Sequence, residues 1–165
     1  MGHMIQCFIG YLNTIQGIVK PLYLQTPVIV ALPQNLHCLF LCDDIYDSIH
    51  KYQNTNNSLG FSPFDVFDIA IKEYLETIQP NGDFIYIETE YFGGVGVQFS
   101  GIFRNGQLLS THKENDDADT SVPYPDNVLM QPINIALREL GVIRDVSLDE
   151  FDTMGLGNYR RIPDV

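Results

Sequence analysis

The sequence predicts an α+β fold in which helices pack against one mainly antiparallel sheet, as a single domain over residues 4–165. Three observations support this prediction: strand-like segments occur before and after a helix, an Asn-Gly turn joins two of the later strands, and helical segments close the chain. A length of 165 residues with 45% hydrophobic residues is enough to bury the core of one domain. Residues 1–4 read as a cloning remnant.

The first 42 residues have the composition of strands. Residues 5–12 are apolar and aromatic, residues 27–32 are rich in β-branched side chains, and residues 38–41 form a third short apolar segment. A helix then follows from an N-cap at Asp43 or Asp44. It should run through Tyr52, because acids lie in its first turn and His50-Lys51 in its last, as the helix dipole favours.

The clearest helical signal begins at Ser62, a good N-cap residue, with Pro63 at the first helical position. Pro80-Asn81-Gly82 ends this segment. Apolar residues at three- and four-residue spacing predict one buried helix face, made of Phe64, Phe67, Ile71, Tyr74, Leu75 and Ile78.

Two strands and a hairpin should come next. Residues 84–91 alternate in the period-two pattern of a strand, and residues 97–103 form another strand after the glycine-rich turn at 92–96. Asn105-Gly106 is the strongest hairpin signal in the chain, because both residues tolerate the positive φ of a type I′ turn. The hairpin should pair residues 97–103 with residues 107–110.

The last third of the chain reads as a loop followed by helices. Residues 111–126 carry acids and prolines with almost no periodicity and predict an exposed loop. Residues 128–140 predict a helix that Gly141 closes. Ser147 to Glu150 form a capping box, which starts a short helix that ends at Gly155.

The charge of the protein limits its partners. Nine Lys and Arg against 21 Asp and Glu give a formal net charge of −12, which repels nucleic acid and anionic membrane surfaces. A basic protein would be attracted. The alternative is that the acidic charge only maintains solubility.

Cysteine usage points to a reduced compartment. Cys7, Cys38 and Cys42 are an odd number in a chain without secretory features, so we expect a cytoplasmic protein with buried free thiols. His37 points away from the two later cysteines and no second Cys/His pair follows, so a zinc site lacks ligands. Residues 117–121 begin like a calcium loop but lack its glycine and closing glutamate. We expect no metal and no cofactor.

Catalytic motifs are weak. The glycines at 93–96 lead into a strand and lack the Gly-Lys-Ser/Thr of a phosphate-binding loop, so a tight or bulged turn is the better interpretation. Glu88 and Glu90 lie on one strand face and would form a general acid/base pair if that face lined a cleft. The other interpretation places them on the solvated face of a sheet. The lack of a strong catalytic motif argues against an enzyme but does not exclude one.

Three segments carry a resemblance: residues 32–47, residues 88–98 (ETEYFGGVGVQ) and residues 149–160 (DEFDTMGLGNYR). Together they resemble a family of small uncharacterised bacterial cytoplasmic proteins. The size and single-domain form of that family are similar to those of immunity proteins that neutralise bacterial toxins. The resemblance therefore implies a protein-binding role, with residues 91–98 and 155–160 as its most distinctive parts.

The favoured hypothesis is an acidic cytoplasmic module that covers a basic surface of a protein toxin. The alternative is a small hydrolase or ligand-binding protein with a pocket near the Gly93–Gly96 turn, in which Glu88 or Glu90 acts as acid/base and Arg160 clamps an anion. A third hypothesis, a homo-oligomeric structural protein, would be favoured by a large exposed apolar patch. The candidate binding residues are Asp43, Asp44, Glu88, Glu90, Tyr91, Gly93, Gly94, Gln98, Tyr159 and Arg160.

Overall fold

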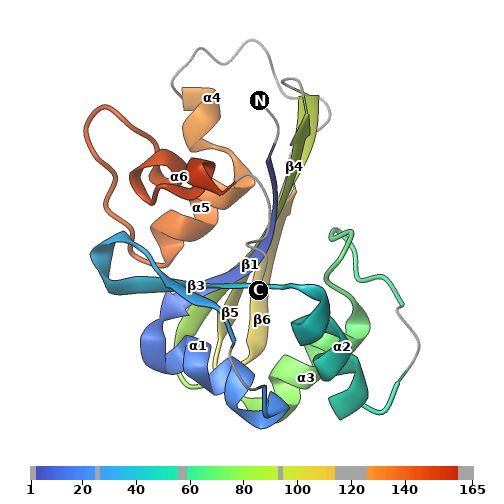
Figure 1. The fold of residues 1–165 in the computed structure, drawn as a ribbon. Coiled ribbons are helices and arrows are strands. Elements are labelled where there is room, and N and C mark those ends of the chain that lie inside the picture. Colours follow the sequence, from blue (N-terminus) through green and yellow to red (C-terminus); the bar gives the residue numbers. More distant parts are fainter. Residues whose placement is uncertain (1–2, 25–26, 56–58, 93–94, 114–125, 160–165) are drawn as a thin grey trace.

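Figure 1 shows the computed structural model, which describes residues 3–24, 27–55, 59–92, 95–113 and 126–159. Six strands form one sheet in the order β2-β3-β1-β4-β5-β6, with every neighbouring pair antiparallel. Helices pack on this sheet, so the predicted α+β class is confirmed. The strands are β1 (His3–Tyr11), β2 (Ile29–Ala31), β3 (Leu36–Phe40), β4 (Asp83–Phe92), β5 (Val95–Arg104) and β6 (Gln107–Lys113).

Helices cover both faces of the sheet, and each face has its own hydrophobic core. One core joins the sheet to α1 (Leu12–Val19), α2 (Asp43–Tyr52) and α3 (Ile69–Ile78). The other joins the sheet to α5 (Pro132–Glu139) and to the segment after α6 (Glu150–Thr153). Short elements complete the fold: α4 (Asp126–Leu129) and the 3₁₀ helices η1 (Lys20–Leu22), η2 (Pro33–Asn35) and η3 (Leu156–Asn158).

The strand β4 lies in the middle of the sheet and is buried on both sides. Phe84 and Tyr86 point into the core under α1, α2 and α3, whereas Ile85 and Ile87 point into the core under α5. Glu88 follows on the same face as Tyr86 and is also buried. The interpretation that Glu88 lies on a solvated sheet face is therefore wrong.

The predicted start of α3 is also wrong. Ser62 does not cap this helix; Asp68 does, by accepting the Ile71 N–H at 3.0 Å. The residues before Asp68 stay outside the helix because their N–H groups bond to Glu88. Phe64 and Phe67 still reach the core. The apolar spacing therefore predicted the buried residues correctly, although the residues before Ile69 are not helical.

The N-terminal third contains a helix that the sequence did not predict. Leu12 ends the expected strand early and begins α1, which buries Thr14, Ile15, Ile18 and Val19. β-branched residues, which favour strands, form much of this buried face. The helix α2 begins as expected, with Asp43 and Asp44 in its first turn, but its N-cap position is Cys42, which makes no side-chain cap bond.

The predicted helix over 128–140 is two helices. Gln131 is extended (φ −66°, ψ 142°) and Pro132 starts α5, because proline disfavours helical geometry in the residue before it and cannot donate an N–H. Gly141 ends α5 with φ +96°, as expected. The N-cap of α6 is Asp149, which accepts the Asp152 N–H at 2.8 Å, so the capping box at Ser147 was misplaced.

Three further expectations have different outcomes. The strand β6 extends to Lys113, into the segment expected to be a loop. The calcium-like residues 117–121 lie outside the described residues.

The cysteines are free, with Cys7 and Cys38 buried and Cys42 half-buried, which confirms the interpretation as free thiols. Burial, and then the neighbouring Cys38, raise the pKa of the Cys7 thiol well above its usual value.

The predicted hairpin turn is confirmed. Asn105 and Gly106 have φ of 49° and 79°, and β5 pairs with β6 on either side of them. A Cβ added to Gly106 would lie 2.1 Å from the carbonyl oxygen of Leu75. Glycine is therefore required here both by the positive φ and by the close approach of α3.

We expect Gly106→Ala to lower the free energy of unfolding by about 3 kcal/mol or more, because backbone strain and a steric clash add together. The matched control is Gly141→Ala: Gly141 has φ +96° but no atom within 4 Å of an added Cβ. It should cost only about 1 kcal/mol. Urea denaturation followed by circular dichroism gives both values, and equal losses would refute the close-approach explanation.

Candidate functional site

The most distinctive polar group of the fold is the carboxylate of Glu88, which is only 3% exposed. Its Oε1 atom accepts the N–H groups of Val66 (2.9 Å) and Phe67 (2.6 Å) and the hydroxyl of Tyr86 (2.9 Å). Its Oε2 atom accepts the N–H of Asp65 at 2.8 Å. Four donors suit an ionised carboxylate, which only accepts hydrogen bonds.

The connection before α3 folds over Glu88 because its aromatic residues are buried there. The rings of Phe64 and Phe67 lie 5.5 and 4.9 Å from the Tyr86 ring. These contacts bring three consecutive N–H groups, those of residues 65–67, toward the sheet. Since no other partner for these N–H groups is available in a helix or strand, the carboxylate supplies one.

Tyr86 remains a hydrogen-bond donor to Glu88. Burial raises the pKa of the Tyr86 phenol well above its usual value, and the negative charge of Glu88 raises it further. The phenol therefore keeps its proton at neutral pH and donates to the carboxylate.

A small open cavity of about 40 Å³ lies beside Glu88. The exposed residues Asp65 and Glu90 line it, so that carboxylates stand at its rim as well as in its wall. This volume admits a few water molecules or the end of one side chain and is far below the roughly 300 Å³ of a typical ligand pocket. The other lining residues are Gln6, Val66, Thr89, Val97 and Phe99.

The start of α2 is attached near this cavity. Leu41 donates its N–H to the carbonyl of Gln6 at 2.8 Å, and Gln6 lines the cavity. Asp43 and Asp44 follow two and three residues later and are exposed. The structure therefore brings Glu88 and Glu90 together and places the acidic first turn of α2 on the same side of the molecule.

Two other predicted residues, Gln98 and Tyr159, do not join this site. The Gln98 side chain donates to Gln131, and the half-buried Tyr159 packs its ring 5.3 Å from that of Phe40. Only the backbone of Tyr91 is described, as part of β4. Gly93, Gly94 and Arg160 lie outside the described residues.

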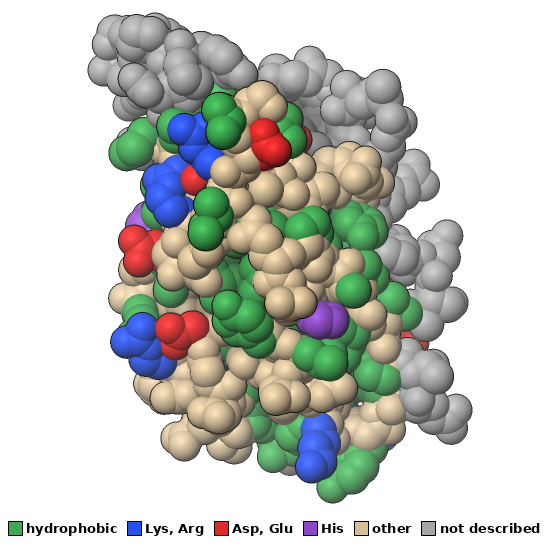
Figure 2. Space-filling view, turned by 90° about the vertical axis from the view of Figure 1, so that its left-hand side faces the viewer, with side chains coloured by type: hydrophobic (Ala, Val, Ile, Leu, Met, Phe, Trp, Pro, Cys, Tyr) green, Lys and Arg blue, Asp and Glu red, His purple; other side chains and the backbone are tan. Residues whose placement is uncertain are grey.

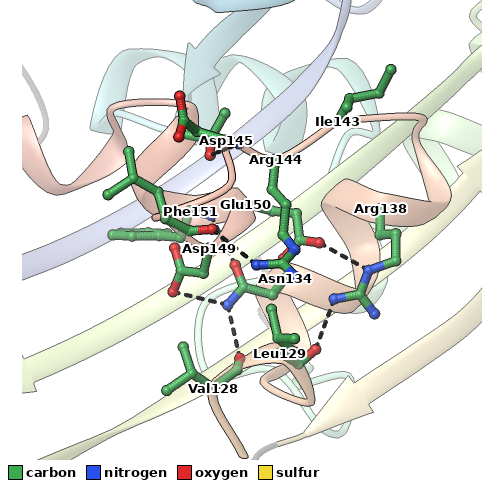
Figure 3. Close-up of polar contacts among 12 residues, drawn as sticks. Val128, Leu129, Asn134, Arg138, Ile143, Arg144, Asp145, Asp149, Glu150 and Phe151 are labelled. Atoms are coloured by element: carbon green, nitrogen blue, oxygen red, sulfur yellow. Dashed lines mark hydrogen bonds and ion pairs between the residues drawn. The ribbon is translucent and has the colours of Figure 1, made fainter. Parts of the chain in front are cut away.

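The third distinctive sequence segment, residues 149–160, begins in a polar cluster between α5 and α6 (Figure 3). Asn134 is its centre: its Nδ2 donates to the carbonyl of Val128 (2.9 Å) and to Asp149 (3.2 Å), and its Oδ1 accepts the N–H of Phe151 (2.8 Å). Asn134 is buried and joins three separate pieces of chain. The cluster therefore has a clear structural role.

An ion pair completes this cluster. Arg138 donates from Nε to Oε1 of Glu150 at 2.9 Å and from a second nitrogen to the carbonyl of Leu129 at 3.0 Å. Glu150 is 2% exposed. Partial burial, followed by the charge of Asp149, raises the pKa of the nearby Asp152 carboxyl.

A second buried carboxylate, Asp68, was not found from the sequence. Besides capping α3, it accepts the hydroxyl of Tyr46 (2.7 Å) and bonds to Nε2 of His50 (2.8 Å). Tyr46 and His50 are four residues apart on α2 and stack at 4.4 Å. That spacing places both on one helix face, but nothing in the sequence indicates the acid they share.

Comparisons with protein-family models, with curated proteins and with solved structures found no match to this chain. Within the described ranges, no group of three or more His, Cys, Asp or Glu side chains is placed to hold a metal ion. No helix in the described part of the chain is long and apolar enough to cross a membrane.

We expect Glu88→Gln to lower the free energy of unfolding by about 3 kcal/mol, because the substitution removes the charge and turns a donor toward backbone N–H groups. Chemical denaturation measures the loss. The control is Glu90→Gln on the same strand, which is exposed and should change stability by less than about 0.5 kcal/mol. A loss at position 88 no larger than at position 90 would show that the four bonds do not hold the connection.

The raised pKa of Tyr86 predicts a loss of stability in alkali. The unfolded phenol ionises near pH 10, whereas the buried phenol stays protonated, so this contribution is complete below about pH 10 and falls as the pH rises. We expect Tyr86→Phe to be less stable at pH 7 and to show a smaller decline between about pH 9 and 11. Some decline should remain, because burial also raises the pKa of Tyr74. Parallel slopes for both proteins would contradict the assignment.

Proposed function

We propose that this protein is an acidic protein-binding module that covers a basic surface of a protein partner. The observation that carries the proposal is the set of exposed carboxylates at and near the Glu88 cavity: Asp65 and Glu90 at its rim, and Asp43 and Asp44 at the start of α2. They belong to a chain with a formal net charge of −12. Such a surface accelerates encounter with a basic protein and disfavours acidic ones.

The size of the cavity supports binding of a protein side chain rather than of a free metabolite. A volume of about 40 Å³ suits the end of one lysine or arginine side chain, for which Glu90 and Asp65 provide opposite charge. Glu88, the residue considered as a general acid or base, already accepts four hydrogen bonds. These bonds favour a structural role for it over proton transfer to a substrate.

A protein toxin neutralised by an immunity protein is the partner class we propose. Support comes from the acidic charge, from the fixed framework under the cavity and from the resemblance carried by residues 88–98 and 149–160. Toxins that act on nucleic acid need basic surfaces to bind it, and an acidic module that covers such a surface blocks access by direct competition.

Capture experiments with wild-type protein and a double variant, Asp65→Asn with Glu90→Gln, test the proposal. The bait is incubated with a lysate of the source organism at about 50 and 500 mM salt, and the affinity of any retained basic protein is then measured after purification. We expect retention at low salt only, and about tenfold weaker binding of the double variant at low salt.

The control variant is Glu73→Gln with Glu139→Gln, which makes the same change in net charge at exposed positions of α3 and α5. Weakening in the control equal to that in the test variant would mean that only overall charge matters. Failure to retain any basic protein at either salt would refute the proposed function.

A further inference from the structure

A positive charge of the protein itself lies next to the Glu88 cavity. Four side chains occupy directly opposed positions on β1, β4, β5 and β6, in the order Gln6, Glu88, Phe99 and Lys113. Directly opposed side chains point to the same face of a sheet. The first three of these residues line the cavity, and Lys113 follows them on the edge strand β6.

The ammonium group of Lys113 lies on an aromatic ring and not on a carboxylate. Its Nζ atom is 5.9 Å from the centre of the Phe99 ring, which is within range of a cation–π contact. None of the four ion pairs among the described residues involves Lys113. Glu88 already accepts four hydrogen bonds, which leaves its carboxylate little capacity for the ammonium group.

A cation that enters the cavity meets the charge of Lys113. Because Phe99 lines the cavity, a cation bound against its ring lies within about 10 Å of the Lys113 ammonium, roughly one Debye length at 0.1 M salt. Repulsion over that distance is only partly screened, and the same ring attracts both cations. Binding is therefore more favourable when Lys113 leaves the ring.

An arginine side chain suits this exchange better than a lysine side chain. Replacing one ammonium group by another on the ring gains little, whereas a planar guanidinium stacks on an aromatic face and binds carboxylates through two parallel bonds. Asp65 and Glu90 are the exposed carboxylates that line the cavity. The volume of about 40 Å³ limits the ligand to the end of one side chain.

The distribution of charge favours the exchange at this place on the molecule. Figure 2 looks onto the side that lies opposite α2 in Figure 1, and there Lys and Arg side chains lie among the acidic ones. The described residues that line the cavity, in contrast, include the three carboxylates of Asp65, Glu88 and Glu90 and no basic side chain. When Lys113 leaves the Phe99 ring, this excess of negative charge attracts an incoming cation.

On the basis of the proposed function, we propose that Lys113 is an internal competitor, which occupies the Phe99 ring until an arginine side chain of the basic partner displaces it. Lys113 is exposed at the end of β6, so its side chain can turn into solvent without a change in the sheet. A partner that offers only lysine gains less from the exchange. Lys113 therefore contributes to the choice of partner as well as to the affinity.

Titration of the full chain with N-acetyl-L-argininamide, which carries one guanidinium and no other charge, tests this inference by NMR. We expect the probe to shift the backbone amide signals of Val97 and Phe99. The ε protons of Lys113, which the Phe99 ring shifts upfield, should return to the position of a free lysine. Lys113→Gln should lower the dissociation constant about threefold, the size of one exposed cation–π contact. N-acetyl-L-lysinamide should bind at least about threefold more weakly than the arginine probe.

The matched control is Lys20→Gln, which removes the same charge at an exposed position of η1 and should leave the dissociation constant nearly unchanged. Lys113→Arg keeps the charge and should not tighten binding. Equal tightening by Lys20→Gln and Lys113→Gln would overturn the inference. A probe that leaves the Lys113 ε protons in place, or that shifts neither amide signal, would overturn it as well, and equal binding of the two probes would refute the assignment to arginine.

Failure of this inference is distinguishable from failure of the proposed function. If a basic protein is captured through Asp65 and Glu90 but Lys113→Gln binds it no more tightly than Lys20→Gln does, the competitor role is wrong and the proposed function stands. Absence of any retained basic protein refutes the proposed function, whereas the titration decides the exchange at Phe99 by itself.

Discussion

The carboxylate of Glu88 determines how one half of the molecule is assembled. It accepts the N–H groups of residues 65–67, which precede α3 and belong to no helix or strand, and so attaches that connection to the central strand β4. Removing an ionised carboxylate from water costs several kcal/mol, and bonds to a charged group return about 1.5–3 kcal/mol each. Four such bonds together are of the size needed to offset that cost.

Several other contacts follow from that attachment. With the connection in place, Asp68 lies at the start of α3, where it caps the helix and bonds to Tyr46 and His50 of α2. Two buried acids on the same side of the sheet thus fix α2 and α3, two of the three helices that cover this face. On the other face Asn134 has the corresponding role, since it joins α5 to the start of α6 through two bonds and to α4 through a third.

The parts of the fold that follow from local preference could be predicted from the sequence. Asn105-Gly106 specifies its hairpin, and Gly141 ends its helix, because positive φ at these positions depends on the residues themselves. The start of α3 could not be predicted, because Ser62 and Pro63 are good helix starters whose preference lost to bonds with a residue more than 20 positions away. The candidate site could be predicted only in part for the same reason. The strand pattern places Glu88 and Glu90 on one face, but only the tertiary structure reveals that Glu88 is buried and Glu90 is exposed.

The strand order has a consequence for how the chain is made. The central strand β1 pairs with β4, whose residues come roughly 80 positions later, and contacts so distant in sequence form slowly. During synthesis Ile5, Cys7 and Ile9 leave the ribosome long before β4 can pair with β1 and α5 can cover them, whereas β4, β5 and β6 form a meander from neighbouring segments. The nascent N-terminal segment therefore exposes apolar residues while most of the sheet is still missing, and the β4–β6 meander supplies a neighbour that β1 can reach only late in synthesis.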